Sequence, residues 1–314
     1  MASAAQSDRA YDWWRLDGAK SLASFMSTYE PSMRERGSTR GGWRIGRPDS
    51  TRHVLELIAD IGAQVDWLAR VRPAYLFARG GAHLQALAEE AARRDAPLRF
   101  ERILSTGTAM TPEARAAARR AFRCDVLDLY GASETGLIAA QCPDCGLMHS
   151  CDETMRVEVL RDDGAPAAEG ELGRVVVTPL YAYAMPMIRY AIGDYAIRGP
   201  ETAPCGRSLG SLRAVVGRAR NLFHLADGRV LAPYANASGF RAFIDYRQIQ
   251  LVQTALDRIE IRYVAASDRP VDAEGAAAFV RERFDPSLEA ELVRVDHIPA
   301  GHGKFEETLS ILAP

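Results

Sequence analysis

Short apolar runs alternate with amphipathic segments between residues 50 and 130, and this alternation constrains the fold more than any other feature of the sequence. Residues 74–77, 100–104 and 126–130 are short and apolar enough to be buried strands. The segments between them have the spacing of amphipathic helices. Strand, helix, strand, helix, strand is the order of a parallel sheet. We therefore predict an α/β fold whose ligands bind beyond the carboxyl ends of the strands.

Two helices next to these strands are predicted with different signals. Apolar residues from Val54 to Leu68 follow helical spacing, which predicts a single helix over residues 50–71. Thr111 is placed to cap a later helix, and Pro112 fits its first position because the missing amide proton is not needed there.

The rest of the chain predicts other kinds of structure. Residues 1–50 show no clear pattern. Three segments read as antiparallel strands of a small barrel-like part, at residues 156–160, 174–179 and 195–198. Beyond them a hairpin, two helices and two strands predict a small α+β domain. The expected organisation is a partial large domain over residues 1–216 and a C-terminal domain over residues 217–314.

The most specific motif follows the third predicted strand, where residues 128–136 read Asp-Leu-Tyr-Gly-Ala-Ser-Glu-Thr-Gly. Taken alone, this is compatible with a glycine turn that carries a hydroxyl cap and a solvated glutamate. Its carboxylate also suits Mg²⁺, a hard cation that takes carboxylate and phosphate oxygens. The loop at residues 105–108, Ser-Thr-Gly-Thr, lies at the same end of the predicted sheet.

Three further motifs follow in order. Residues 189–194 read Arg-Tyr-Ala-Ile-Gly-Asp, Gly217 precedes Arg218, and residues 299–305 read Pro-Ala-Gly-His-Gly-Lys-Phe. Each alone fits an ordinary turn or an exposed side chain. An ionised aspartate can, however, accept hydrogen bonds from two neighbouring hydroxyl groups. A lysine on a flexible glycine loop can stabilise charge that develops at a reacting group.

In this order and spacing, the motifs resemble those of the adenylate-forming acyl- and aryl-CoA ligases, and in particular the phenylacetate–CoA-ligase-like group. The resemblance implies ATP-dependent activation of a small carboxylic acid, aryl or acyl, to an acyl-adenylate. Transfer to CoA or a carrier thiol would follow after the C-terminal domain swings about the segment that begins at Arg218. The family fold is a large AMP-binding domain followed by a small mobile domain.

The resemblance also implies roles for individual residues. Tyr130 would stack on adenine, the Ser133 hydroxyl would meet the α-phosphate, and Glu134 would hold Mg²⁺. Lys304 would be the catalytic lysine of the adenylation step. The remaining nucleotide-binding residues would be Gly107, Gly131, Thr135, Asp194 at the ribose, and Arg218 near ribose and phosphate.

The cysteines form a second constellation. Of five cysteines, three lie within ten residues, a distribution that favours metal binding or free thiols over a disulfide framework. Cys142 and Cys145 form a Cys-x₂-Cys turn that presents two thiolates to one tetrahedral ion. His149, Cys151 and Cys205 compete for the other two positions. We favour His149 and Cys205, since a ligand from a distant loop would link the strands between them.

This cysteine pattern resembles a metal knuckle of some phenylacetate–CoA-ligase-like proteins. Four protein ligands leave no open position, which predicts a structural zinc ion. The alternative is a group of unmetallated thiols.

The family's Ser/Thr/Gly-rich phosphate loop, which ends in lysine and wraps the β- and γ-phosphates, has no good counterpart. Residues 36–42 have the glycines and hydroxyl groups, but no long Ser/Thr run, and their basic residues are in a different order. We therefore expect an N-terminally truncated member of the group. The alternatives are half of a two-chain ligase with a complementing N-terminal chain, and a non-catalytic zinc-stapled nucleotide-binding or scaffolding protein.

Composition limits the partners and the location. The formal charge of −2 gives no general attraction to nucleic acid or to an anionic membrane. The longest apolar stretches are too short to span a bilayer, and the first residues lack the pattern of a secretory signal. We expect a cytoplasmic protein that binds neither nucleic acid nor membrane, with a homodimer as the usual state of the resembled group.

Overall fold

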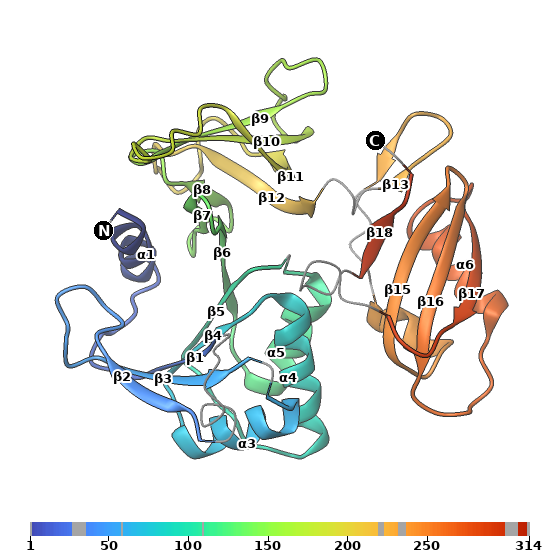
Figure 1. The fold of residues 1–314 in the computed structure, drawn as a ribbon, viewed down its shortest axis with the longest axis horizontal. Coiled ribbons are helices and arrows are strands. Elements are labelled where there is room, and N and C mark those ends of the chain that lie inside the picture. Colours follow the sequence, from blue (N-terminus) through green and yellow to red (C-terminus); the bar gives the residue numbers. More distant parts are fainter. Residues whose placement is uncertain are drawn as a thin grey trace. The chain divides into compact units, whose positions relative to one another are not determined.

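The structure is a computed structural model, which describes residues 2–26, 36–57, 59–108, 110–218, 223–231, 237–298 and 307–312. The chain divides into two compact units, Met1–Val215 and Val216–Pro314 (Figure 1). The sequence placed this boundary between residues 216 and 217.

The first unit is built around one sheet, which begins with mostly parallel strands. These are β1 (Leu22–Met26), β2 (Ser38–Gly41), β3 (Thr51–Glu56), β4 (Tyr75–Ala78), β5 (Arg102–Thr106) and β6 (Val126–Ala132). Strand β1 pairs in parallel with β3 and β4, and the pairs β4–β5 and β5–β6 are also parallel. The predicted parallel α/β sheet is therefore confirmed.

The second half of the same sheet is antiparallel. Its strands are β7 (Gly136–Gln141), β8 (Met148–Ser150), β9 (Met155–Leu160), β10 (Leu172–Pro179), β11 (Tyr190–Arg198) and β12 (Ser211–Arg218). The described strands form one twelve-stranded sheet in the order β2-β3-β1-β4-β5-β6-β7-β8-β12-β11-β10-β9. The part that the sequence suggests to be small and barrel-like thus continues the large sheet.

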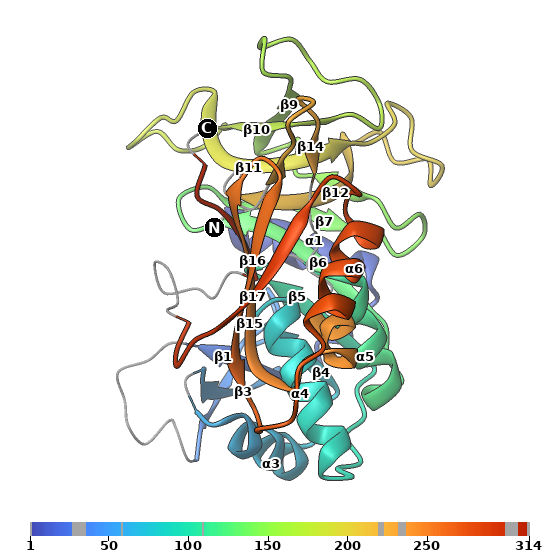
Figure 2. The ribbon, with the colours of Figure 1, turned by 90° about the vertical axis from the view of Figure 1, so that its right-hand side faces the viewer.

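Three helices pack on one face of the parallel strands: α3 (Ile61–Val71), α4 (Gly81–Arg93) and α5 (Pro112–Phe122). Figures 1 and 2 show them grouped together, and their apolar stripes form one core with the strands. Helix α5 begins as predicted, because the Thr111 hydroxyl accepts a hydrogen bond from the Ala114 N–H and Pro112 takes the first helical position. Helix α1 (Ala2–Trp13) lies against β7.

The single helix predicted over residues 50–71 is wrong. The structure has strand β3 and then helix α3, which begins after Asp60 caps it by accepting hydrogen bonds from the N–H groups of Gly62 and Ala63. Strand β3 lies inside the sheet, so Val54 and Leu55 are both buried. A strand buried on both faces has no apolar–polar alternation, and its spacing therefore does not exclude a helix.

The basic, glycine-rich sequence of residues 34–42 predicts a loop, and this prediction is wrong for four of these residues. Ser38–Gly41 forms β2, an antiparallel strand at the edge of the sheet. Helix α1 and strand β1 likewise lie in the N-terminal stretch that showed no clear pattern.

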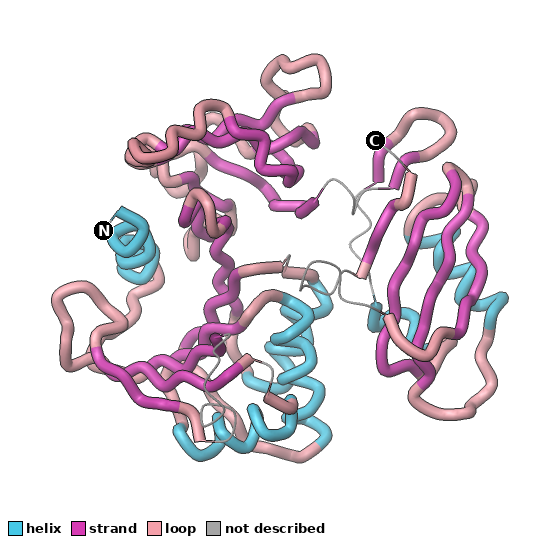
Figure 3. The backbone as a smooth tube through the Cα atoms, in the orientation of Figure 1, coloured by secondary structure: helices cyan, strands magenta, loops and turns pink. Residues whose placement is uncertain are grey.

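The second unit is a small α+β domain, as predicted. Its four-stranded sheet has the order β17-β16-β15-β18, and its strands are β15 (Tyr246–Ala255), β16 (Arg258–Ala265), β17 (Glu289–Arg294) and β18 (Thr308–Ser310). Helix α6 (Ala273–Arg283) shares the core with this sheet. Figure 3 shows the helix in cyan beside the magenta strands of this unit. A hairpin of β13 (Phe223–His224) and β14 (Val230–Leu231) and the 3₁₀ helix η2 (Ala237–Ala242) complete the described part.

None of the helices in the described ranges is both long enough and apolar enough to cross a membrane.

Candidate functional site

The Tyr-Gly-Ala-Ser-Glu-Thr-Gly motif forms the turn between β6 and β7. Ala132 pairs with Gly136, so residues 133–135 are a three-residue hairpin loop. Gly136 has φ 79°, a left-handed conformation that suits such a loop and that glycine adopts without strain. A Cβ atom at Gly131 would lie 2.7 Å from the Gly136 carbonyl oxygen. The glycines of the motif therefore allow a tight turn that holds Ser133 and Glu134 exposed at its tip.

Asp194 comes to this turn from β11, although 64 residues separate it from Tyr130. The Tyr130 hydroxyl donates a hydrogen bond to Asp194 Oδ2 at 2.8 Å. A bulge in β11, where Gly193 has φ 82°, interrupts the pairing with β10. Bulges of this kind redirect a side chain at the edge of a regular ladder. Tyr130 itself is buried, with 8% of its surface exposed, so this pair is anchored in the core.

Tyr190 makes the complementary contact. Its hydroxyl lies 3.3 Å from Glu134 Oε1 and donates to it. The preceding Arg189 has φ 51°, and its N–H donates to the Thr178 hydroxyl at 2.9 Å. A non-glycine residue in this conformation is strained, and such strain often accompanies functional sites. Tyr190 belongs to the motif at residues 189–194, but the sequence alone indicates no role for it. Its contact with Glu134 depends on how distant strands pair.

The loop that follows β5 lies near the loop that follows β4. Gly107 has φ 108°, a conformation that favours glycine. Gly80 has φ 87°, and a Cβ atom added there would lie 2.8 Å from the Thr108 nitrogen. The close approach of Gly80 to Thr108 brings the carboxyl ends of β4 and β5 together, at the end of the parallel strands where ligands are expected to bind.

Asp128 lies two residues before Tyr130 and is a titratable group that the sequence did not single out. Burial raises the pKa of its carboxyl to about 7, although Arg115 on α5 acts in the opposite direction. Its Oδ1 accepts a hydrogen bond from the Leu129 N–H. Arg115 in turn donates to the Val126 carbonyl and to Gln141 Oε1. This polar group lies at the base of the β6–β7 turn.

His83 is held by neighbouring groups of the fold. Its Nδ1 accepts from the Arg79 N–H at 3.1 Å, and its Nε2 lies 2.8 Å from Gln64 Oε1. These partners place the proton on Nε2, and burial lowers the pKa of the ring to about 4. His83 is therefore a neutral imidazole that fixes the start of α4.

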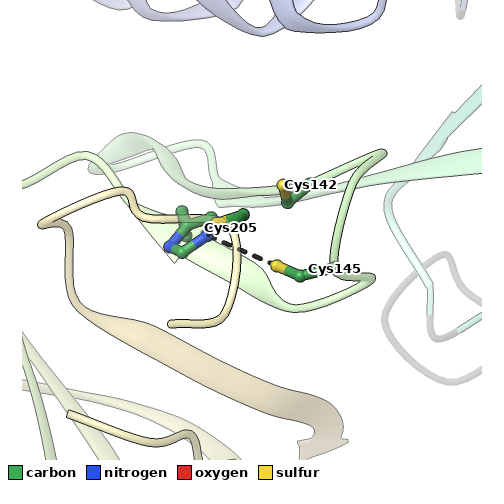
Figure 4. A group of neighbouring side chains, drawn as sticks. Cys142, Cys145 and Cys205 are labelled. Carbon is green, nitrogen blue, oxygen red and sulfur yellow. Dashed lines mark hydrogen bonds between the residues drawn. The ribbon is translucent and has the colours of Figure 1, made fainter. Parts of the chain in front are cut away.

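The structure gathers Cys142, Cys145, His149 and Cys205, and their ligand atoms all lie within 4.8 Å of one another. His149 Nε2 is 3.2 Å from the sulfur of Cys205 and 3.7 Å from that of Cys145. Figure 4 draws this group and labels its three cysteines. Three thiols and one imidazole nitrogen that converge on a point match the donor set of a structural zinc site. The Nε2 nitrogen faces the thiols, the orientation that a ligating imidazole needs.

Cys151 is not in this group. It is fully buried, and its sulfur accepts a hydrogen bond from Arg9 Nη2 at 3.4 Å. At Cys205, burial alone would raise the pKa, but hydrogen bonds that involve Arg207, His149 and Cys145 together lower it to about 6. A thiolate is the form that binds metal, so the surroundings of Cys205 favour ligation.

Two predicted site residues are not part of the arrangement in the first unit. Arg218 ends β12 and belongs to the second unit. Lys304 lies outside the described residues. Among the predicted nucleotide residues, the structure brings together Tyr130, Asp194 and the β6–β7 turn. The Thr135 hydroxyl is buried in that turn and has no hydrogen-bond partner among the residues that the structure describes.

The comparisons with known proteins point in one direction. No protein-family model matches the sequence. A phenylacetate-coenzyme A ligase of Thermus thermophilus is 27% identical over 139 residues, which are 43% of this chain. The chain thus matches only 29% of the length of that relative.

Solved structures match over nearly the whole chain. A 2-hydroxyisobutyryl-CoA ligase in complex with 2-HIB-AMP has a TM-score of 0.74 at 18% identity, over 98% of this chain and 69% of that one. The amide bond synthetase McbA from Marinactinospora thermotolerans has a TM-score of 0.63 at 17% identity, over 95% and 62%. An anthranilate CoA ligase in complex with anthranoyl-AMP has a TM-score of 0.64 at 12% identity, over 94% and 59%. The protein therefore has the fold of the adenylate-forming CoA ligases and resembles a phenylacetate-coenzyme A ligase in sequence.

Proposed function

We propose that the protein activates a carboxylic acid with ATP and passes the acyl group to a thiol such as CoA. The hydrogen bond between Tyr130 and Asp194 carries this proposal, because it joins two motifs that are far apart in sequence at one point of the sheet. The Thermus relative is a CoA ligase, and the solved relatives include structures with acyl-adenylates bound. Similarity in fold and motif supports the same chemistry here.

In the proposed first step, a carboxylate oxygen of the acid attacks the α-phosphorus of ATP. The bond from that phosphorus to the bridging oxygen breaks, and pyrophosphate leaves. The Tyr130 ring would stack on adenine, and the Asp194 carboxylate, with lone pairs beyond the one that meets Tyr130, would accept hydrogen bonds from the ribose hydroxyls. Ser133 would donate to the α-phosphate.

Glu134, exposed at the tip of the turn, would hold Mg²⁺ together with the phosphates, and the ion would offset their negative charge. Tyr190 would keep this carboxylate in place. In the second step a thiol sulfur attacks the acyl carbonyl carbon and AMP leaves. Zinc bound by the four-residue cluster would stabilise the fold and take no part in the reaction.

The lysine content of the chain supports the role of Lys304. All but two of its 39 lysine and arginine residues are arginine, and the two lysines are Lys20 and Lys304. Lysine carries a compact point charge that a guanidinium does not reproduce. A lysine that follows Gly301 and Gly303 in an otherwise arginine-rich sequence is consistent with a catalytic ammonium group. The cytoplasmic location and the homodimer remain predictions.

The test is calorimetry with ATP, AMP and a panel of aryl and acyl acids, followed by ATP–pyrophosphate exchange with the acids that bind. We expect AMP to bind and one class of acid to support exchange. AMP binding without exchange for every acid would favour a non-catalytic nucleotide-binding protein, or one that needs a complementing chain. The proposal would be contradicted if the wild type showed no AMP binding by calorimetry and the Asp194→Ala variant gave the same result.

A further inference from the structure

Helix α1 meets the cysteine cluster through Trp13. The ring centroids of Trp13 and His149 are 6.0 Å apart, and the two ring planes are at 84°. The guanidinium carbons of Arg9 and Arg207 each lie 4.8 Å from the Trp13 ring centroid. Trp13 therefore contacts one candidate ligand directly and an arginine that reaches another.

Arg207 contacts the cluster itself. Its Nη1 donates to the Cys142 sulfur at 3.0 Å and to Asp144 Oδ2 at 2.8 Å. Arg207 is a permanent cation, because the guanidinium group of arginine stays protonated in proteins. Three thiolates, one neutral imidazole and Zn²⁺ carry a net charge of −1. The guanidinium of Arg207 has the opposite charge and lies in contact with one of the sulfurs.

The ring of His149 lacks the usual support of a ligating histidine. Such a histidine normally donates its second N–H to a carboxylate, a carbonyl group or water. Here Nδ1 is buried and has no hydrogen-bond partner within the described residues. Trp13 packs against the ring instead, so packing rather than a hydrogen bond fixes the direction of Nε2.

Other contacts of α1 reach the same region of the sheet. Gln6 and Arg9 contact Thr154 and Glu153, which follow Cys151. Trp14 donates from Nε1 to the Gln141 carbonyl oxygen at 2.7 Å. Gln141 directly precedes the first ligand of the cluster. The segments that hold α1 in place are therefore joined, along the chain, to residues of the cysteine cluster.

We propose that metal binding at the four-residue cluster fastens helix α1 to the sheet. Arg207 is a positioning residue that strengthens metal binding by offsetting the charge of the thiolates, and Trp13 joins the metal site to the helix. This inference concerns the metal site alone and does not depend on adenylation.

The first experiment measures zinc affinity by competition with a chromophoric chelator. Arg207→Gln should weaken binding about 10- to 100-fold, the usual cost of losing a partner of a metal ligand. Arg207→Lys retains the charge and should lie between Arg207→Gln and the wild type. The matched control is Arg213→Gln, because Arg213 is an exposed arginine that pairs with Glu169, and it should bind zinc as the wild type does.

Equal zinc affinity in Arg207→Gln and in the wild type would overturn the role of Arg207, and a wild type that binds no zinc would overturn the whole inference. If far-ultraviolet circular dichroism shows that Arg207→Gln does not fold, Arg207→Lys is the deciding variant. Lysine should lose the hydrogen bond to Cys142, so wild-type zinc affinity in a folded Arg207→Lys protein would contradict the role of Arg207.

The second experiment follows amide hydrogen exchange in the full chain with zinc bound and after chelation. We expect exchange in residues 2–13 to become at least several-fold faster without zinc, while β16 of the second unit stays unchanged as an internal reference. The variant Trp13→Ala, loaded with zinc, should exchange in this helix as the metal-free wild type does. Unchanged protection of α1 after verified removal of zinc would overturn the link.

Discussion

The Tyr130 hydroxyl donates a hydrogen bond of 2.8 Å to Asp194 Oδ2 and so connects the β6–β7 turn to the bulge in β11. Tyr190 of the second motif contacts Glu134 of the first. Each motif thus supplies a tyrosine that meets the carboxylate of the other. Two short segments that would be weak signals alone are thus linked by two hydrogen bonds, which preorganise the carboxylates of Glu134 and Asp194.

The first prediction concerns the nucleotide. Asp194→Asn should weaken AMP binding about 10- to 100-fold, because hydrogen bonds to a charged group contribute about 1.5–3 kcal/mol. Tyr130→Phe keeps the ring and loses only the hydroxyl, and its loss of affinity should be smaller, below about 10-fold. Calorimetry with AMP measures both. The control is Tyr195→Phe, on the neighbouring position of β11; an equal loss in this variant would show a general effect on the strand.

The second prediction concerns the exposed carboxylate. Glu134→Gln should lower pyrophosphate exchange at least about 100-fold and weaken its dependence on Mg²⁺, because an amide is a poor ligand for this ion. AMP binding without magnesium should remain. Glu158→Gln is the matched control, since Glu158 on β9 pairs with Arg189, which directly precedes β11. Exchange at the wild-type rate in Glu134→Gln would exclude Glu134 from metal binding.

The third prediction uses the low lysine content of the chain. Lys304→Ala should abolish pyrophosphate exchange and spare thioester formation from supplied acyl-adenylate, because the ammonium group is proposed to act only in the first step. Lys20→Ala removes the other lysine, which pairs with Glu101 at the surface, and should leave both half-reactions intact. Equal loss of the two half-reactions in Lys304→Ala would count against its assigned role.

Sequence reasoning succeeded where the signal was local. The parallel strands, the Thr111 cap and the order of the motifs were all readable from neighbouring residues. Strand β15 was missed, because it lies inside its sheet and buries polar side chains. Gln253 is fully buried there and bonds to the backbone of His224 and to Ser310, which removes the expected alternation.

Other features depend on contacts between distant residues. The pairing of Tyr190 with Glu134 follows from the register of a bulged strand. The seat of α1 beside the cysteine cluster requires Trp13 to meet His149, 136 residues further along the chain. Neither relationship leaves a pattern in the sequence that spacing or composition could identify.

The fourth prediction distinguishes the cysteines. The purified protein should contain about one zinc ion per chain, and Cys142→Ser or Cys205→Ser should lose it and unfold at a lower temperature. Cys151→Ser should retain zinc, because the structure places Cys151 outside the cluster and against Arg9. Metal content by mass spectrometry of the native chain and thermal unfolding provide the two measurements. Zinc loss in Cys151→Ser with retention in Cys205→Ser would reverse the ligand assignment.

The fifth prediction concerns pH. Burial raises the pKa of Asp128 to about 7 in the folded protein, whereas an unfolded aspartate titrates near pH 4. Between these values the folded chain holds a proton that the unfolded chain has released, so this group lowers the free energy of unfolding as pH rises from about 4 to 7. The loss cannot exceed about 4 kcal/mol, at about 1.4 kcal/mol for each pKa unit.

Asp128→Asn imitates the protonated acid and keeps the acceptor for the Leu129 N–H. It should therefore be more stable than the wild type at pH 8 and similar to it near pH 4.5, as measured by urea unfolding at both values. Asp125→Asn is the control, because Asp125 lies three residues away, is exposed and pairs with Arg119. Its effect should be small and show no gain at pH 8. A difference between Asp128→Asn and the wild type that does not grow with pH would show that Asp128 is ionised in the folded protein throughout this range, and that Arg115 outweighs the cost of its burial.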